Sequence, residues 1–246
     1  KRNKGTALLL KMFNKILRKY TISRDKIRTI LTTLAQDEHI YYEFYKLINE
    51  NNTIEDDYRS GTSSTYVTRL FKTKYKNLPT KVDKYLDLGC ADGSKTLELG
   101  NMLNAKEIHG VDIEDFYGTI IRKEGFMFRS YKEGASLPYE DNTFDVISSL
   151  HVLHHIDNKI DTLNEIKRVL KPNGIIIIRE HDLNTEFDHK LVDIEHFIYI
   201  LSIKQQFKLS NLESYKSFYE TRGDLQNMMQ TLGYKSDFYN NSNNYN

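Results

Sequence analysis

The 246-residue chain has 39% hydrophobic and 28% charged residues, which is typical of a globular protein large enough to bury a full core. No apolar run approaches the roughly 18 residues that a membrane span needs, and no signal peptide is visible, so no membrane partner is expected. The single cysteine, Cys90, excludes an internal disulfide and favours a reducing compartment, which predicts a cytoplasmic protein.

The chain begins with Lys1 rather than methionine, and we therefore expect a piece of a longer polypeptide that has other domains as partners. Its net charge of +1 hides an asymmetry, because segment 1–28 has ten Lys or Arg residues and one acid, Asp25. The charged residues of segment 36–57 are mostly acidic. A basic segment on a nearly neutral protein is typical of contact with a polyanion. A solvated helix face, balanced in space by acids, accounts for it equally well.

The first part of the chain is predicted to be a helical extension, residues 1–80, basic at its start. Apolar residues recur at spacings of three and four through residues 6–50, and Ser23 is a plausible helix start. Residues 51–65 are polar and predict a connection. A helical pattern resumes at residues 66–75 and ends before Pro79.

From residue 81 onward, short apolar runs alternate with helical patterns. The predicted strands are 85–88, 107–111, 126–131, 144–149 and 175–179, and the helices between them are 95–103, 117–123 and 159–170. This alternation predicts an α/β fold, with a Rossmann-like, doubly wound, mostly parallel sheet and helices on both faces. Helices at 188–207 and 223–232 and an edge strand at 234–239 complete the predicted domain, 81–246. The low-complexity tail from about residue 240 is expected to be disordered.

The first predicted strand ends in the sequence YLDLGCADG, residues 85–93. Gly89 and Gly93 permit a sharp turn close to a ligand, whereas Asp87 and Asp92 make the turn acidic and unsuitable for phosphate. Asp112 ends the second predicted strand, where an acid accepts hydrogen bonds from ribose hydroxyls. Together these features predict an adenosine-type ligand. NAD is disfavoured because GCADG lacks the middle glycine that admits a pyrophosphate; S-adenosylmethionine, which has an ammonium group, a sulfonium and a ribose, fits better.

Five segments in order resemble the motifs of class I S-adenosylmethionine-dependent methyltransferases: LDLGCADG, HGVDIED, EGASLPYEDNTFDVI, SSLHVLHHI and EIKRVLKPNGIIII. The resemblance implies that the turn packs against the methionine part of the cofactor through Asp87, Gly89, Ala91 and Gly93. It further implies ribose binding by Asp112, adenine contacts by Ile113, and a methyl donor facing His151. Family members often have an aspartate for the adenine amino group where this chain has Glu133.

Methyl transfer from a sulfonium needs mainly positioning, since the methyl group is already activated. An acceptor that must lose a proton would need a base, and the candidates for catalysis are His154, His155 and Glu180. The alternative for His154 is that it only orients the loop in which it lies.

The sequence REHD, residues 179–182, follows the fifth predicted strand and is unusually polar. With the sequence DIEHF at 193–197 it contains histidines and acids that could ligate a metal. No rigid spacing of two histidines accompanies them, so no metal site is predicted, and hydrogen bonding to a polar substrate is the preferred interpretation.

The basic start and the 17 tyrosines and 12 phenylalanines suggest an RNA substrate. The helical extension also resembles that of mRNA cap guanine-N7 methyltransferases, which predicts mRNA capping by a domain of a large DNA virus enzyme, found in the cytoplasm, a virion or a viral factory. That resemblance implies a cap-facing His154, guanine contacts by Glu180 or Glu195, and phosphate contacts by Lys11, Lys15, Arg18 and Lys19. The alternatives are a small-molecule methyltransferase and an inactive methyltransferase fold that only binds a partner. A ribose 2′-O methyltransferase is disfavoured, since the fifth strand offers Arg179 and no lysine.

Overall fold

The structure is a computed structural model, and it describes residues 4–37, 39–40, 42–43, 46, 78–79, 81–113, 124–132, 134–202 and 215–238. The connection predicted at 51–65, the helices predicted at 66–75 and 117–123, and the tail from 240 lie outside these ranges. None of the helices in the described ranges is both long and apolar enough to span a bilayer.

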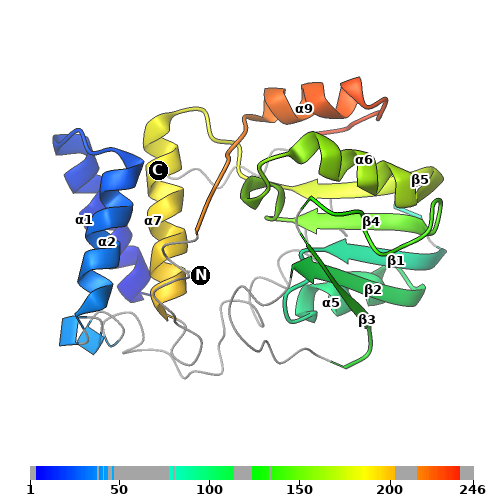
Figure 1. The fold of residues 1–246 in the computed structure, drawn as a ribbon, viewed down its shortest axis with the longest axis horizontal. Coiled ribbons are helices and arrows are strands. Elements are labelled where there is room, and N and C mark those ends of the chain that lie inside the picture. The colour runs from blue at the N-terminus through cyan, green and yellow to red at the C-terminus, as the bar shows by residue number, and fades with distance from the viewer. Residues whose placement is uncertain are drawn as a thin grey trace.

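The described part of the chain contains one sheet of five strands in the order β3-β2-β1-β4-β5, and all pairings are parallel (Figure 1). The strands are β1 (Val82–Leu88), β2 (Ala105–Ile113), β3 (Met127–Tyr131), β4 (Phe144–Leu150) and β5 (Leu170–Arg179). This order confirms the predicted doubly wound α/β fold. The chain leaves β1 towards β2 on one side and later returns to β4 on the other, so ligands are expected beyond the carboxyl ends of β1 and β4.

The edge strand predicted at 234–239 is wrong over its described residues, because 234–238 form no strand. Tyr234 instead follows the last helix in a turn, where its backbone N–H donates to Met229 O. Its ring packs against the core beside that helix. Tyr234 therefore packs against the core beside the helix instead of pairing in the sheet, and Phe238 is exposed.

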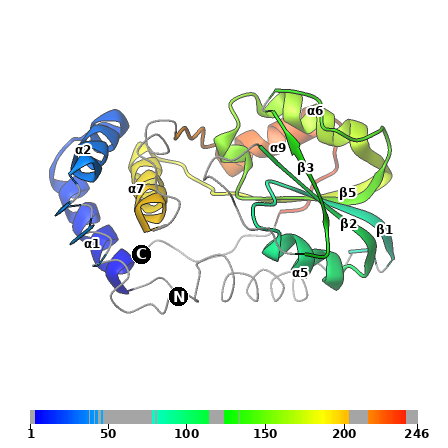
Figure 2. The ribbon, with the colours of Figure 1, turned by 60° about the horizontal axis from the view of Figure 1, so that its bottom comes forward.

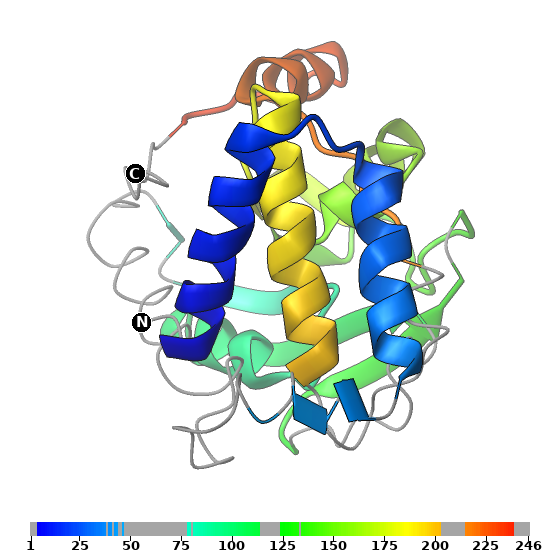
Figure 3. The same cartoon turned by 90° about the vertical axis from the view of Figure 1, so that its left-hand side faces the viewer.

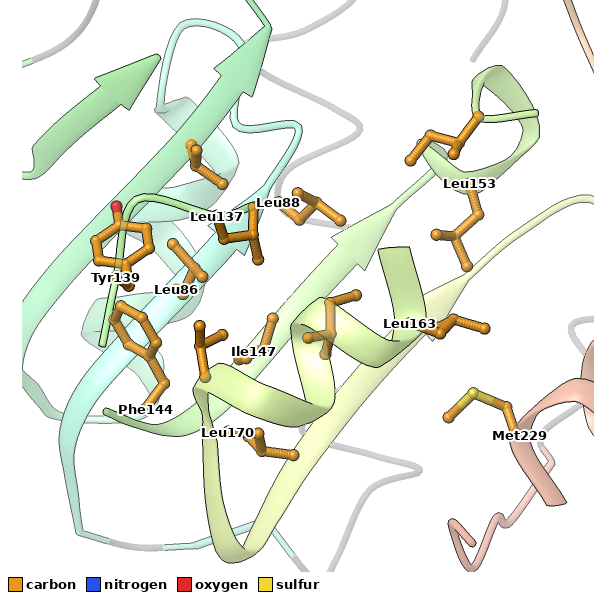
Figure 4. Close-up of a cluster of buried hydrophobic side chains, with 14 residues drawn as sticks. Leu86, Leu88, Leu137, Tyr139, Phe144, Ile147, Leu153, Leu163, Leu170 and Met229 are labelled. Atoms are coloured by element: carbon orange, nitrogen blue, oxygen red, sulfur yellow. The ribbon is translucent and has the colours of Figure 1, made fainter. Parts of the chain in front are cut away.

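Helices cover both faces of the sheet, as the alternation of buried side chains along the strands requires. Tyr85 and Val146 face α5 (Ser94–Met102), whose Leu99 lies in the same cluster. Leu86 and Ile147 point to the opposite face, which is covered by α6 (Lys159–Val169) and α9 (Arg222–Thr231) (Figure 2). Figure 4 shows this second cluster, in which Leu163 of α6 and Met229 of α9 close over the strands.

The helical extension is described as α1 (Lys4–Lys19) and α2 (Arg24–Gln36), and both pack against α7 (Glu186–Ser202) (Figure 3). Ser23 caps α2 by accepting a hydrogen bond from Lys26 N, which confirms the predicted helix start. The three helices share a buried cluster of Leu9, Leu17, Ile27, Leu31, Ile194, Phe197, Ile198 and Tyr215. One hydrophobic core therefore contains side chains from both sides of the predicted domain boundary at residue 80.

Candidate functional site

The turn after β1 has the backbone geometry that its glycines suggested. Gly89 and Gly93 have φ angles of +74° and +83°, and Ala91 between them has a φ of +46°. The backbone N–H groups of Gly89 and Cys90 both donate to Val111 O, which ties the turn to β2. Since α5 begins at Ser94, Gly93 is the N-cap residue of that helix, and the turn leads directly into the helix N-terminus.

Neighbouring side chains occupy the space where these glycines lack a Cβ. A Cβ on Gly89 would lie well inside van der Waals distance of Val152, and one on Gly93 would overlap the ring of Phe126. The two glycines therefore allow the chain segments after β4 and before β3 to approach the turn closely. In this way they fix the shape of the site as well as its backbone.

Asp87 lies beneath the turn and is buried, with 3% of its surface exposed. Its carboxylate accepts hydrogen bonds from Thr96 Oγ1 at 2.6 Å and from Ser148 Oγ, and Ser148 in turn lies 2.6 Å from the hydroxyl of Tyr85. Burial raises the pKa of Asp87 to about 6, although the two hydroxyl hydrogen bonds act in the opposite direction. A cation placed at this turn would favour the ionised carboxylate.

Asp112 and Asp92 hold the two ends of the turn. Asp112 Oδ2 accepts from Ala91 N at 2.7 Å, and its Oδ1 accepts from Ile113 N at 2.8 Å. Asp92 accepts from both the backbone N and the hydroxyl of Ser94, so it caps α5. A carboxylate oxygen has two lone pairs, so Asp112 can hold the turn and still accept from hydroxyl groups of a ligand.

Glu180, at the end of β5, organises the loop after β4. One carboxylate oxygen accepts from the backbone N–H groups of Val152 and Leu153, at 2.8 and 2.7 Å, and the other lies 2.6 Å from His154 Nδ1. Burial would raise the pKa of Glu180, but His154 and these donors keep that pKa below its ordinary value. Glu180 is thus a buried acceptor that binds three groups of this chain.

Five histidines gather beyond the carboxyl ends of β4 and β5: His151, His154, His155, His181 and His196. Four of them follow β4 or β5 directly, and His196 comes from α7. Burial, together with the neighbouring histidines, lowers the pKa of His151 and His196 well below 6.5 and that of His181 to about 4. The site is therefore lined by rings of which these three are neutral near pH 7.

A hydrogen-bond chain connects His196 to the helical extension. Tyr219 donates to Asp193 at 2.9 Å, Tyr215 lies 3.2 Å from Tyr219, and His196 Nδ1 contacts the Tyr215 hydroxyl. Because Asp193 can only accept, Tyr219 is the donor at that end of the series. Arg24 of α2 lies at the other end of this hydrogen-bond chain, where its guanidinium donates to both oxygens of the Asp193 carboxylate.

The segment at 215–219 and α7 cover this group of histidines. Phe218 N donates to His154 O at 2.7 Å, and His155 Nδ1 lies 3.2 Å from Lys216 O. The rings of His154 and His196 stack with centroids 5.2 Å apart. The segment 215–219 and α7 therefore pack directly against the loop after β4, where His155 stays exposed.

The structure brings most of the predicted site residues to this edge of the sheet and leaves a few elsewhere. Glu195 is half-buried on α7, next to His196. The basic side chains Lys11, Lys15, Arg18 and Lys19 are exposed on α1, and Glu133 lies outside the described residues. Sequence reasoning missed Thr96, Tyr215 and Tyr219, which lie in none of the five motifs, and Ser148, which begins SSLHVLHHI. It also did not place His196 beside His154.

Residues 86–178 match the model of a family described as methyltransferase domain. An uncharacterized methyltransferase of Schizosaccharomyces pombe is 31% identical over 149 residues, which cover 53% of this chain and 51% of that protein. A 27-O-demethylrifamycin SV methyltransferase of Amycolatopsis mediterranei is 27% identical over 128 residues, which cover 48% and 46%. The chain thus spans about half the length of these curated relatives.

Among solved structures, the chain is similar to an S-adenosylmethionine-dependent methyltransferase of Thermotoga maritima. The TM-score is 0.51 with 16% sequence identity, and the alignment covers 84% of this chain and 82% of that structure. This likeness confirms the predicted Rossmann-like fold. The match to the methyltransferase-domain model over residues 86–178 implies S-adenosylmethionine as the cofactor.

Proposed function

We propose that the protein transfers a methyl group from S-adenosylmethionine to a small polar organic acceptor. The observation that carries this proposal is the group of five histidines beyond the carboxyl ends of β4 and β5, together with the glycine turn after β1. The acceptor binds among neutral histidine and tyrosine side chains, which both donate and accept hydrogen bonds. The relative from Amycolatopsis is named for a small organic substrate, which supports the same class of acceptor.

The residues at the turn fit the proposed cofactor. Asp112 has lone pairs for ribose hydroxyls, and the buried Asp87 has a raised pKa, so a positive group near it would be stabilised. Bound S-adenosylmethionine supplies a methyl group on a positively charged sulfur. The part of this chain is to hold the acceptor in line with that group and to exclude water, and such positioning can supply most of the rate enhancement.

Among the catalytic candidates, Glu180 and His154 are engaged with each other and with the backbone of the loop. We assign them the role of positioning residues that fix the loop after β4. This assignment agrees with the alternative that the sequence left open for His154. Guanine recognition by Glu180 would have to share a carboxylate that already accepts from three groups of this chain.

Cofactor binding tests this proposal first. Asp112→Ala removes a charged acceptor, which contributes about 1.5–3 kcal/mol, so the affinity for S-adenosylmethionine should fall roughly ten- to a hundredfold. Isothermal titration calorimetry measures the change, and Asp237→Ala, which alters an exposed aspartate far along the chain, is the matched control. Unchanged affinity in Asp112→Ala would refute the assignment of this residue.

The acceptor class is tested by following S-adenosylhomocysteine formation with a panel of small alcohols, amines and carboxylic acids, and with capped RNA. Turnover of a small acceptor supports the proposal. A wild-type protein that binds no S-adenosylmethionine would instead be an inactive fold acting as a binding module. A protein that binds the cofactor and methylates only RNA would contradict the small-molecule proposal but not the cofactor site.

A second candidate is methylation of RNA, including guanine N7 of an mRNA cap. It is favoured by the exposed basic side chains of α1, which recur every three or four residues and so lie along one side of the helix. Phosphates of a bound strand would contact such a face. The relative from Amycolatopsis, which is named for a small organic substrate, favours the smaller acceptor over this candidate.

A further inference from the structure

Three of the histidines meet in an arrangement suited to a common ligand. One ring nitrogen from each of His151, His154 and His181 lies within 4.8 Å of the corresponding nitrogens of the other two. The three rings are tilted against one another by 50°, 61° and 69°. Because the lone pair of an imidazole nitrogen lies in the ring plane, tilted rings can direct their nitrogens towards one point.

Two of these rings have buried nitrogens that nothing in the described part of the chain contacts by a hydrogen bond. They are His151 Nδ1 and His154 Nε2, and His154 as a whole is only 3% exposed. Leaving a buried polar atom without a hydrogen-bond partner lowers the stability of the folded state. A ligand that accepts these lone pairs would remove that cost.

Glu180 prepares His154 to bind such a ligand. A His154 ring whose Nδ1 donates to the Glu180 carboxylate, 2.6 Å away, presents the unpartnered Nε2 as its ligand atom. A carboxylate behind a histidine in this way is the usual support of a metal-binding imidazole. The backbone N–H groups of Val152 and Leu153 hold Glu180 itself in place.

We propose that His151, His154 and His181 form a binding site for a divalent transition-metal ion, with zinc as the best match. Imidazole ligands suit zinc, and three histidines with a fourth position open is a known pattern of zinc coordination. Zinc–nitrogen distances of about 2.0–2.1 Å place tetrahedral ligand nitrogens about 3.4 Å apart. Small side-chain rotations that draw the three nitrogens together are therefore needed on binding.

A second group, formed by His154, His155 and His196, also has nitrogens within 4.8 Å of one another. It is the weaker candidate because the rings of His154 and His196 are stacked with an angle of only 8° between their planes. The lone pairs of two parallel, stacked rings cannot both point at one ion. In addition, the Nδ1 atoms of His155 and His196 already contact Lys216 O and Tyr215.

Metal binding can be measured without cofactor or acceptor, so its outcome is independent of the proposed function. Tag-free protein is treated with a chelator and titrated with Zn²⁺ against a chromophoric chelator, and separately with Co²⁺ while visible absorption is recorded. We expect one ion per chain and the intense absorption of tetrahedral Co²⁺. A wild-type protein that binds no ion at micromolar concentrations overturns the proposal.

Three variants and a control test which residues are the ligands. His151→Ala and His181→Ala should each abolish the cobalt spectrum, whereas Glu180→Gln should weaken metal binding about 10- to 100-fold, as expected for a supporting residue. His39→Ala, which changes an exposed histidine outside the cluster, should bind like wild type. If stoichiometric binding survives in both His151→Ala and His181→Ala, the proposed site is wrong. Circular dichroism melts establish that each variant is folded, and His181→Ala, at a half-buried position after β5, is the variant best placed to remain so.

Discussion

Gly89 and Gly134 have nearly the same backbone conformation, with φ angles of +74° and +79°, but very different surroundings. A Cβ on Gly89 would overlap Val152, whereas a Cβ on Gly134 would meet no atom of the described chain within 4 Å. Comparing these two positions therefore distinguishes two reasons why a protein needs glycine at a given position. Backbone strain acts at both positions, but the overlap acts only at Gly89.

We predict that Gly89→Ala destabilises the protein more than Gly134→Ala does. The left-handed conformation costs a non-glycine residue about 1–2 kcal/mol at either position, and overpacking at Gly89 adds about 1–3 kcal/mol. Urea unfolding measures both changes. Val152→Ala introduced into the Gly89→Ala protein should recover part of the loss. Equal free energies of unfolding for the two single variants would show that the overlap with Val152 is relieved without cost.

The raised pKa of Asp87 predicts a particular pH dependence of stability. An unfolded aspartate loses its proton near pH 4, whereas folded Asp87 keeps its proton up to about pH 6. Between these values the folded state binds more protons than the unfolded chain, so the contribution of Asp87 to stability decreases as pH rises through the window. Below about pH 4 and above about pH 6 the contribution is constant.

Asp87→Asn should remove this contribution. The difference in unfolding free energy between wild type and variant should therefore change between about pH 4 and pH 6, by up to about 3 kcal/mol for a shift of two pKa units. Urea unfolding at several pH values measures it. Parallel stability curves for the two proteins would mean that Asp87 titrates at its ordinary pKa.

At the scale of elements, the pairing of Arg24 with Asp193 fastens α2 to α7. Asp193 is buried and also accepts hydrogen bonds from Ser217 and Tyr219, while the Arg24 side chain is 28% exposed. The pair lies in the same region as the shared apolar cluster of α1, α2 and α7. It therefore contributes both to docking of the extension and to the hydrogen-bond chain that ends at His196.

Arg24→Ala should lower the free energy of unfolding by about 1–3 kcal/mol, because it leaves a buried carboxylate with only two hydroxyl donors. Lys26→Ala, an exposed change on the same helix, should have little effect. Chemical denaturation of Arg24→Ala, Asp193→Asn and the double variant gives the coupling energy of the pair. If the two single changes in unfolding free energy add up to that of the double variant, Arg24 and Asp193 are not coupled. Their contact then contributes nothing to stability.

Sequence reasoning located elements whose signals are local and missed contacts that depend on packing. Ser23 was recognised because an N-cap and its helix are adjacent in sequence, and the glycine turn because its residues are consecutive. The early start of β5 at Leu170 was missed, since it follows from pairing with Phe144 on another strand. The position of His196 beside His154 depends on how α7 packs, and no spacing along the chain encodes it.

At the scale of the whole molecule, the exposed positive charge on α1 allows a test that distinguishes the two acceptor classes. The four basic residues of α1 are exposed, and Arg18 also stacks over Phe187 of α7 at 5.6 Å. If the acceptor is RNA, these side chains should contact phosphates, and each contact contributes roughly 0.7 to the log–log salt slope for a single strand.

Neutralising Lys11, Lys15, Arg18 and Lys19 together should then weaken RNA binding and flatten its salt dependence. For a small-molecule enzyme, we expect no salt-dependent RNA binding and unchanged turnover in the same variant. Fluorescence anisotropy of a labelled capped RNA at several salt concentrations measures the first outcome, and S-adenosylhomocysteine release measures the second. Salt-dependent RNA binding that disappears in the variant would favour the RNA candidate over the small-molecule proposal.

The shared cluster of α1, α2 and α7 also sets an order of events during synthesis. Arg24 and Asp193 are 169 residues apart, so at about 5–20 residues per second the ribosome delivers α7 roughly 10–30 s after α2. During that interval Leu9, Leu17, Ile27 and Leu31 lack the partners that bury them in the finished protein. We therefore expect the amino-terminal helices to be cut by protease in ribosome-bound chains that end at residue 180, and to be protected once the chain extends past residue 238. These two helices would be made well before α7 but become stable only with it, and until then they would depend on chaperones to shield their apolar sides.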